Sequence, residues 1–230
     1  MWKSEKNSLL WLYGIPGCGK TVLASTIIEN LRNDKNSLQG LLYFYFGFND
    51  AKKQHLNDAL RSLIKQLYLK RYDVRNHLDL LIEEDGSQPS LKKLVETFRH
   101  MIKEISEIWI VLDALDECPA FVQDVVGNEH PRRELLSWIK NLWNSQMNIH
   151  LLITSRPEQD IKEAIESCPC NKTIVPIQND LVGEDIRAYI HTRVREHQGL
   201  KRWQSHPEVQ KEIESQLIEK AGGMFRWVSC

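Results

Sequence analysis

The stretch Gly14-Ile15-Pro16-Gly17-Cys18-Gly19-Lys20-Thr21 follows the pattern G-x-x-x-x-G-K-[ST] at every fixed position. Glycines in such a loop let successive backbone N–H groups point inward at an anion. We then expect Lys20 to reach the β- and γ-phosphates of a nucleotide and the Thr21 hydroxyl to ligate Mg²⁺. An apolar run at residues 9–13 precedes the loop, and a helical pattern begins at Val22. This order predicts a strand, a phosphate-binding loop and a helix, with residues 14–22 binding the nucleotide.

Further apolar runs, rich in β-branched and aromatic residues, follow at 41–46, 108–112, 149–154 and 173–175. Near-continuous apolarity is typical of parallel strands that are covered on both faces. Between the runs, apolar residues recur at three- and four-residue spacing in segments 56–67, 91–105 and 131–143. Strands that alternate with helices predict an α/β domain of three layers around a parallel, five-stranded sheet.

The pattern becomes purely helical after about residue 178. We therefore expect a nucleotide-binding core at 1–178 and the start of a helical lid subdomain at 179–230, truncated at its C-terminal end. One helix is predicted from about Pro207 to Lys220, because Gly222-Gly223 provides a typical helix end. The segment between Cys118 and Pro131 is predicted to be a mobile connector.

A second motif ends the apolar run at 108–112, which is followed by the carboxylates of Asp113, Asp116 and Glu117. Ligands of parallel sheets sit at the carboxyl ends of the strands. Asp113 is placed to hold Mg²⁺ through water and so to complete the ion site begun by Thr21. Asp116 and Glu117 are candidates to orient or deprotonate the attacking water. The alternative is a solvated acidic turn, which the phosphate loop earlier in the chain makes the weaker interpretation.

A third motif, Thr154-Ser155-Arg156-Pro157, follows the run at 149–154 and reaches the same sheet edge. Arg156 is a candidate to contact the γ-phosphate, because a guanidinium matches phosphate oxygens well. The alternative is a surface arginine before a proline. Arg132 and Arg133 are candidates to act on a neighbouring subunit's nucleotide, but solvated first-turn residues are the favoured interpretation.

The overall composition excludes several classes of partner. The chain of 230 residues has a formal net charge of −1, so no global field draws it to nucleic acid or to an anionic membrane. No apolar stretch approaches a membrane span, and no signal peptide is evident. Five cysteines without framework spacing indicate free thiols in a reducing, cytoplasmic environment. Cys18 is expected to be a small filler of the phosphate loop whose exposed position leaves it open to oxidation. Cys168 and Cys170 are too closely spaced for a zinc knuckle.

Together the three motifs resemble the NACHT NTPases of the STAND class, above all the fungal domains that precede ankyrin or WD repeats. The residues that carry the resemblance are Trp11 to Thr21, Val111 to Cys118, Thr154 to Glu158, and the closing segment Lys220 to Val228. The resemblance covers nearly the whole chain. It implies a sheet in which the strand ending near Arg156 lies between the strands of the first two motifs.

The resemblance also implies a regulatory switch that rests with ADP, exchanges it for ATP, oligomerises and resets by slow hydrolysis. Partners would be neighbouring domains of a receptor-like protein or further copies of the chain. GTP is the alternative ligand. Its recognition motif N-K-x-D is missing, because Asn171-Lys172-Thr173-Ile174 has no Asp, and this favours ATP. A scaffold with a vestigial nucleotide site is the second hypothesis, and a motor or a metabolite kinase is a distant third.

Overall fold

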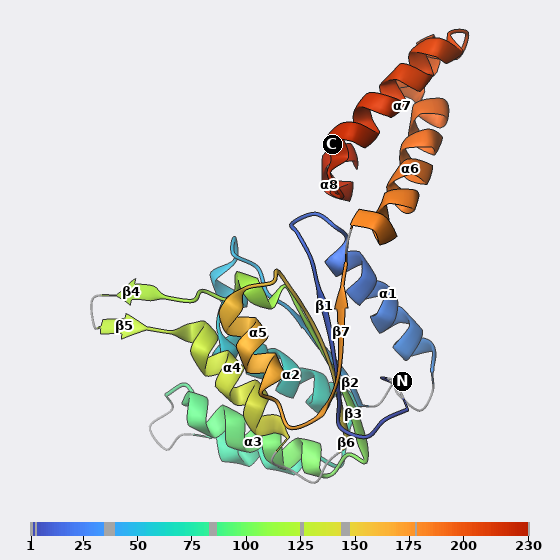
Figure 1. Ribbon diagram of the computed structural model, residues 1–230. Coiled ribbons are helices and arrows are strands. Elements are labelled where there is room, and N and C mark those ends of the chain that lie inside the picture. Colours follow the sequence, from blue (N-terminus) through green and yellow to red (C-terminus); the bar gives the residue numbers. More distant parts are fainter. Residues whose placement is uncertain are drawn as a thin grey trace.

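Five parallel strands form the centre of the domain in the computed structural model (Figure 1). The described residues are 2, 4–34, 40–82, 87–124, 127–143, 148–177 and 179–229. The strands are β1 (Ser8–Tyr13), β2 (Leu41–Tyr45), β3 (Glu107–Asp113), β6 (Asn148–Ser155) and β7 (Asn171–Pro176), arranged in the order β2-β3-β6-β1-β7. The predicted parallel five-stranded sheet is confirmed, and β6 lies between β3 and β1 as the resemblance implied.

The central strands are buried on both faces, which explains why their sequences lack alternation. Every residue of β3 after Glu107, and every residue of β6 after Asn148, is buried. The parallel register pairs Tyr13 with Ser155 and Tyr45 with Asp113, so neighbouring strands end at almost the same level. This common edge receives the three motifs.

Helices cover both faces of the sheet and complete the three predicted layers (Figure 1). Helix α1 (Lys20–Asn33) covers one face, where Ile28 and Leu31 pack in one buried cluster with Trp109. The other face carries the larger core and the remaining helices of this part of the chain, α2 (Leu56–Lys70), α3 (Leu91–Lys103), α4 (Pro131–Leu142) and α5 (Gln159–Glu166). Short 3-10 helices are η2 (Ala51–Lys53), η3 (Arg75–Leu81), η4 (Leu115–Glu117) and η5 (Gln198–Trp203).

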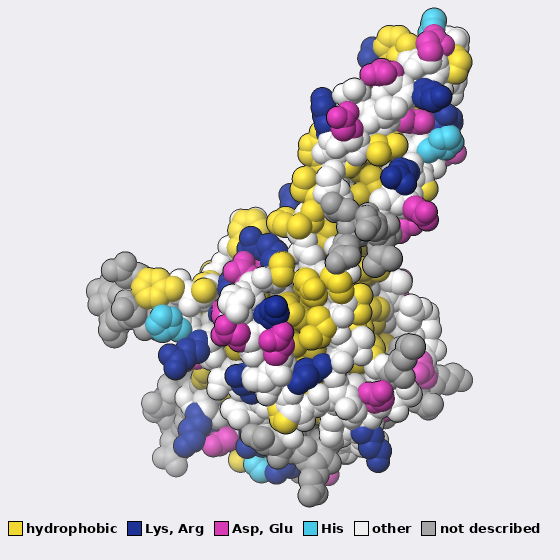
Figure 2. Space-filling model, viewed as in Figure 1, with side chains coloured by type: hydrophobic (Ala, Val, Ile, Leu, Met, Phe, Trp, Pro, Cys, Tyr) yellow, Lys and Arg dark blue, Asp and Glu magenta, His cyan; other side chains and the backbone are white. Residues whose placement is uncertain are grey.

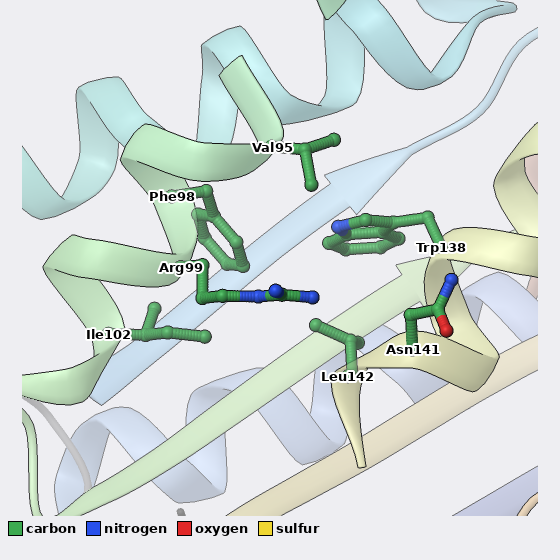
Figure 3. A pocket seen from close by; sticks show the side chains of 7 residues that line it. All are labelled: Val95, Phe98, Arg99, Ile102, Trp138, Asn141 and Leu142. Carbon is green, nitrogen blue, oxygen red and sulfur yellow. The ribbon is translucent and has the colours of Figure 1, made fainter. Parts of the chain in front are cut away.

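Helices α3 and α4 enclose a small hollow in this outer layer (Figure 3). The rings of Phe98 and Trp138 lie 5.8 Å apart between their centroids, at a tilt of 54°. Arg99 and Asn141 are its polar lining residues among apolar neighbours. The hollow is small, and its lining includes no residue of the three motifs.

A buried polar network ties the N-terminal segment to the opposite, amino edge of the sheet. The Ser8 hydroxyl donates to the Trp2 carbonyl at 2.7 Å and lies 2.9 Å from His150 Nδ1. His150 Nε2 lies 3.0 Å from a Glu107 carboxylate oxygen, and the imidazole stacks on Trp109. Because buried polar groups need partners, this network fixes three strand beginnings and one terminal segment together.

After β7 the chain is helical and rises away from the sheet (Figure 1). It forms α6 (Asn179–Glu196), η5, α7 (Pro207–Ala221) and α8 (Phe225–Ser229), which share a small core of their own. Ile177 packs against both this core and the cluster beneath α1. Figure 2 shows hydrophobic side chains gathered where this segment meets the sheet domain. Gly222, at φ 53°, ends α7 as predicted.

The segment between Cys118 and Pro131 was predicted to be a mobile connector, but the structure contains strands there. It contains an antiparallel hairpin of β4 (Val122–Asp124) and β5 (Gly127–Glu129), separate from the main sheet (Figure 1). Each strand has three residues. Strands this short fall below the length at which apolar periodicity distinguishes a strand from a loop.

Gly40, immediately before β2, is predicted to be essential for strand pairing. A Cβ atom there would clash with the Glu107 carbonyl oxygen, which is backbone and cannot move aside cheaply. We expect Gly40→Ala to lower the free energy of unfolding by about 1–3 kcal/mol. Gly183→Ala is the matched control, because nothing lies within 4 Å of its added Cβ. In the α6 helix that change should be neutral or stabilising. Urea unfolding curves measure both, and equal stability of the two variants would contradict the steric argument.

Candidate nucleotide-binding site

The three motifs meet at the carboxyl edge of β1, β3 and β6. The phosphate-binding loop begins at Gly14, directly after β1, and its backbone N–H donates to the Ser155 carbonyl at the end of β6. Asp113 is the last residue of β3. The parallel register therefore brings segments about 90 and 40 residues apart in the chain onto one surface.

Glycine is required in the loop for steric reasons that the structure makes specific. Gly17 and Gly19 have φ angles of 75° and 97°, in the left-handed region that other residues rarely adopt. A Cβ at Gly14 would lie 2.7 Å from Cys18 Sγ and 3.0 Å from a carbonyl oxygen. The loop leads into α1 with Gly19 at its N-cap, so free backbone N–H groups at the helix start face the loop, as an anion site requires.

The side chains of the loop take distinct positions. Lys20 Nζ donates to the carbonyl oxygens of Gly14 and Ile15, each at 2.8 Å, and so lies across the loop. Pro16 to Val22 line the cleft described below. Cys18 is buried at 3% exposure, which corrects the expectation that it is exposed to oxidation. Its sulfur fills the space beside Gly14, where burial shields it from solvent.

Thr21 and Asp113 join the first two motifs directly. Thr21 Oγ1 donates to Asp113 Oδ2 at 2.8 Å, and Thr154 Oγ1 from the third motif donates to Oδ1 at 2.5 Å. Asp113 is 2% exposed, and burial raises the pKa of its carboxyl group against the opposing effect of the two hydroxyl donors. A hydroxyl and a carboxylate are hard oxygen ligands, so this pair fits Mg²⁺ bound mostly by water and phosphate.

The turn after β3 separates the roles of the two remaining carboxylates. Ala114 has φ 57° and its backbone N–H donates to Thr154 Oγ1, so the chain turns sharply into η4. Asp116 is 7% exposed, and its carboxylate accepts from Arg156 N at 3.0 Å and from Arg156 Nε at 2.6 Å. Glu117 lines the cleft, and one of its oxygens accepts from the Phe48 N–H. Both carboxylates thus border the cleft, but Asp116 is paired with Arg156 whereas Glu117 accepts a backbone N–H.

Arg132 lies behind the η4 turn, in a buried position that the sequence did not lead us to expect. It is 7% exposed, so it is neither a solvated first-turn residue nor presented to a neighbouring subunit. Its Nη2 and Nε donate to the carbonyl oxygens of Asp116 and Cys118 at 2.7 and 2.8 Å. The helical spacing indicated that Arg132 is buried, because it lies three and four residues before the buried Leu135 and Leu136 and so on the same face of the helix. Arg133 is exposed, as expected.

A cleft of about 1080 Å³ lies over this edge, between the loop and the helical segment. From the core it is lined by the loop, Ala114, Asp116, Glu117 and Arg156, and from the helical segment by Asp185, Tyr189, Phe225 and Arg226. The backbone N–H of Arg226 donates to the Gly17 carbonyl at 3.4 Å. A volume of this size is sufficient for a nucleotide.

The fold and this edge define the class of protein, a P-loop NTPase. Among solved structures, a Walker-type ATPase of Pyrococcus abyssi matches with a TM-score of 0.52 at 14% identity, over 96% of this chain and 60% of that one. The Drosophila ORC structure, which is bound to DNA, matches with a TM-score of 0.55 at 12% identity, over 100% of this chain and 55% of that one. At these identities the likeness shows the fold alone.

Residues 1–156 match the family described as nephrocystin 3, N-terminal, and the chain belongs to this family. It is also 26% identical over 234 residues to the vegetative incompatibility protein HET-E-1 of Podospora anserina. That match covers 98% of this chain but only 16% of HET-E-1, so the chain corresponds to a small part of that relative. These matches confirm the resemblance to fungal NACHT-domain NTPases.

In the described part of the chain, neither a membrane-spanning helix nor a metal-binding cluster of side chains is found. Among those residues, no helix has the length and apolar character needed to cross a bilayer. Within the same residues, Cys168 and Cys170 are free thiols, and no cluster of three or more His, Cys, Asp or Glu side chains is arranged to hold a metal. A Mg²⁺ site of the kind inferred here needs no such cluster, because phosphate and water supply most ligands.

The reactivity of Cys118, which follows η4, reports whether this turn stays closed in the native protein. Burial raises the pKa of its thiol to about 12. At about pH 8 the thiolate fraction is then on the order of one in ten thousand. We expect iodoacetamide to leave Cys118 unmodified in the native protein and to modify it in concentrated urea, as measured by peptide mass spectrometry. Rapid labelling without urea would contradict the closed turn.

Proposed function

We propose that this domain binds a Mg²⁺–nucleoside triphosphate, ATP in preference to GTP, in the cleft and hydrolyses it slowly. The observation that most supports the proposal is the 2.8 Å hydrogen bond between Thr21 and Asp113. This bond joins the end of the phosphate-binding loop to the carboxylate of Asp113, a charged group that is buried although packing alone would favour an apolar side chain. The missing N-K-x-D motif favours ATP.

Residues of the loop would hold the phosphates. Backbone N–H groups of residues 14–22 and the start of α1 would bind phosphate oxygens, and Lys20 would exchange its two carbonyl partners for the β- and γ-phosphates. Thr21 would contribute its hydroxyl to Mg²⁺, and Asp113 would bind the water around the ion. The ion, when bound, neutralises charge on the phosphate oxygens.

The η4 turn would serve the hydrolytic step. Water attacks the γ-phosphorus, the bond to the bridging oxygen of the β-phosphate breaks, and the products are a nucleoside diphosphate and inorganic phosphate. Glu117 would orient this water and accept its proton, because it faces the cleft. Asp116 would act by holding Arg156, which lines the cleft and whose guanidinium would contact the γ-phosphate.

The proposal also covers the organisation of the domain. Residues 1–178 would form the nucleotide-binding core, and residues 179–230 a helical lid whose Tyr189 and Phe225 line the cleft. Such a domain would act as a signalling or oligomerisation switch in a larger receptor-like protein of the cytoplasm. Its partners would be neighbouring domains or further copies of the chain. The net charge of −1 gives no support for binding nucleic acid or membranes.

Loss of Lys20 should abolish tight nucleotide binding. Lys20→Ala removes a charged donor worth roughly 2 kcal/mol, so the Kd for Mg·ATP should rise about 30-fold or more. Calorimetric titration with ATP and with GTP measures this and fixes the base preference. Lys162→Ala is the control, because Lys162 is exposed and pairs only at 4.0 Å with Glu166. An unchanged Kd in Lys20→Ala would refute the proposed site, and tighter binding of GTP would refute the ATP preference.

Loss of the Glu117 carboxylate should separate binding from hydrolysis. Glu117→Gln keeps the side-chain shape but removes the proton acceptor, so kcat should fall by about 100-fold or more while the Kd for Mg·ATP stays within about threefold. Phosphate release and titration measure the two quantities. Glu166→Gln, at an exposed ion pair, is the control. Equal background rates of phosphate release in all three proteins would favour a scaffold with a vestigial site.

A further inference from the structure

The guanidinium of Arg132 is a buried charge packed behind the η4 turn. Its partners are two backbone carbonyls, together with the carboxylates of Glu158 and Asp160, whose oxygens lie 3.6 and 3.5 Å from its Nη1. Burying an ion costs several kcal/mol unless excellent geometry compensates, and an apolar side chain would pack on α4 at less cost. Packing alone therefore does not explain why a charged side chain occupies this position.

The two carbonyl groups that Arg132 binds belong to Asp116 and Cys118, the residues on either side of Glu117. A single planar guanidinium thus fixes the backbone immediately before and after this carboxylate. The backbone N–H of Arg132 also donates to the Pro119 carbonyl, so the start of α4 holds the next residue of the turn. Glu117 is consequently presented to the cleft from a backbone that Arg132 holds at one residue before it and at the two residues after it.

Arg132 also couples this turn to the third motif. Arg156 binds the Asp116 carboxylate, while Arg132 binds the carbonyl of the same residue. Both guanidinium groups lie beside Glu158, with its Oε1 3.8 Å from Arg156 Nη2 and its Oε2 3.6 Å from Arg132 Nη1. The two arginines and two acidic residues form a closed ring, in which a shift of the turn would also displace Arg156.

We propose that Arg132 is a positioning residue for hydrolysis, which fixes Glu117 and Arg156 relative to each other without touching the nucleotide. This inference rests on the proposed function. Arg132 binds both carbonyls through two nitrogens of one rigid fork, whereas a lysine offers a single nitrogen. Removing the fork releases the turn, and a displacement of about 1 Å at a reacting group costs up to about 100-fold in rate.

The test compares Arg132→Lys and Arg132→Gln with Arg133→Gln, the same residue type at the neighbouring, exposed position. We expect kcat for Mg·ATP to fall about 10- to 100-fold in both Arg132 variants, with the Kd for Mg·ATP within about threefold of the parent value. Hydrogen exchange provides a second readout that needs no nucleotide. Exchange should accelerate at the Glu117 and Cys118 amides, which bond to Ala114 and Leu115 within the turn, and stay unchanged in Arg133→Gln.

The combined outcomes distinguish the two proposals. Faster exchange in the turn together with reduced kcat supports the positioning role. Unchanged kcat in folded Arg132→Lys overturns it, whether exchange accelerates or not, and so does reduced kcat with unchanged exchange. If Arg132→Gln does not fold, Arg132→Lys carries the test, since it keeps the charge. If the parent protein neither binds nor hydrolyses nucleotide, the proposed function fails and the positioning role in hydrolysis falls with it, even where exchange shows that Arg132 holds the turn.

Discussion

The hydrogen bond from Thr21 to Asp113 is the contact on which the arrangement of the site depends. Thr21 belongs to the first turn of α1 and Asp113 ends β3, two strands away from β1. The intervening strand β6 brings Thr154 to the other oxygen of the same carboxylate. The buried Asp113 carboxylate therefore joins three segments of the sheet edge: its own strand, the start of α1 and the end of β6. A shift of one residue in the register would move these groups about 3.3 Å along the strand and turn the shifted side chains to the other face, so sheet pairing and site geometry are a single constraint.

This edge concentrates buried charge in a way that stability alone does not favour. Asp113, Asp116 and Arg132 are each at most 7% exposed. Burial raises the pKa of Asp113, which means that the folded chain disfavours the ionised form that a metal ion would need. A cation beside Thr21 would reverse that balance, because an opposite charge stabilises the carboxylate. A buried carboxyl group with a raised pKa at the edge of a cleft is typical of functional sites.

Much of the fold was predictable because its signals are local. Apolar runs identify doubly covered parallel strands, and the glycines of the loop identify a backbone with positive φ angles, which Gly17 and Gly19 adopt and other residues rarely do. Strand order came from the resemblance, since periodicity says nothing about which strands pair. The paired strands β4 and β5 were missed because they are too short to show a period. Arg132 was misassigned for a different reason: residue type suggested the surface, whereas its helical position, one turn before Leu135 and Leu136, indicated the core. The division of labour between Asp116 and Glu117 depends on a partner 40 residues away, which no local pattern encodes.

The contact between the loop and the helical segment extends this constraint to the rest of the chain. Arg226 donates its backbone N–H to the Gly17 carbonyl, and a Cβ on Gly17 would lie 3.1 Å from that of Arg226. The loop and α8 therefore pack backbone against backbone, with little space between them. Nucleotide phosphates would bind the loop from the side that faces the cleft, where Phe225 also lies. A loop held by phosphate would offer α8 a different surface from one held by Lys20. Because close-packed interfaces respond to such differences by repacking rather than by gradual deformation, a nucleotide bound as proposed would act on the contact between the loop and α8.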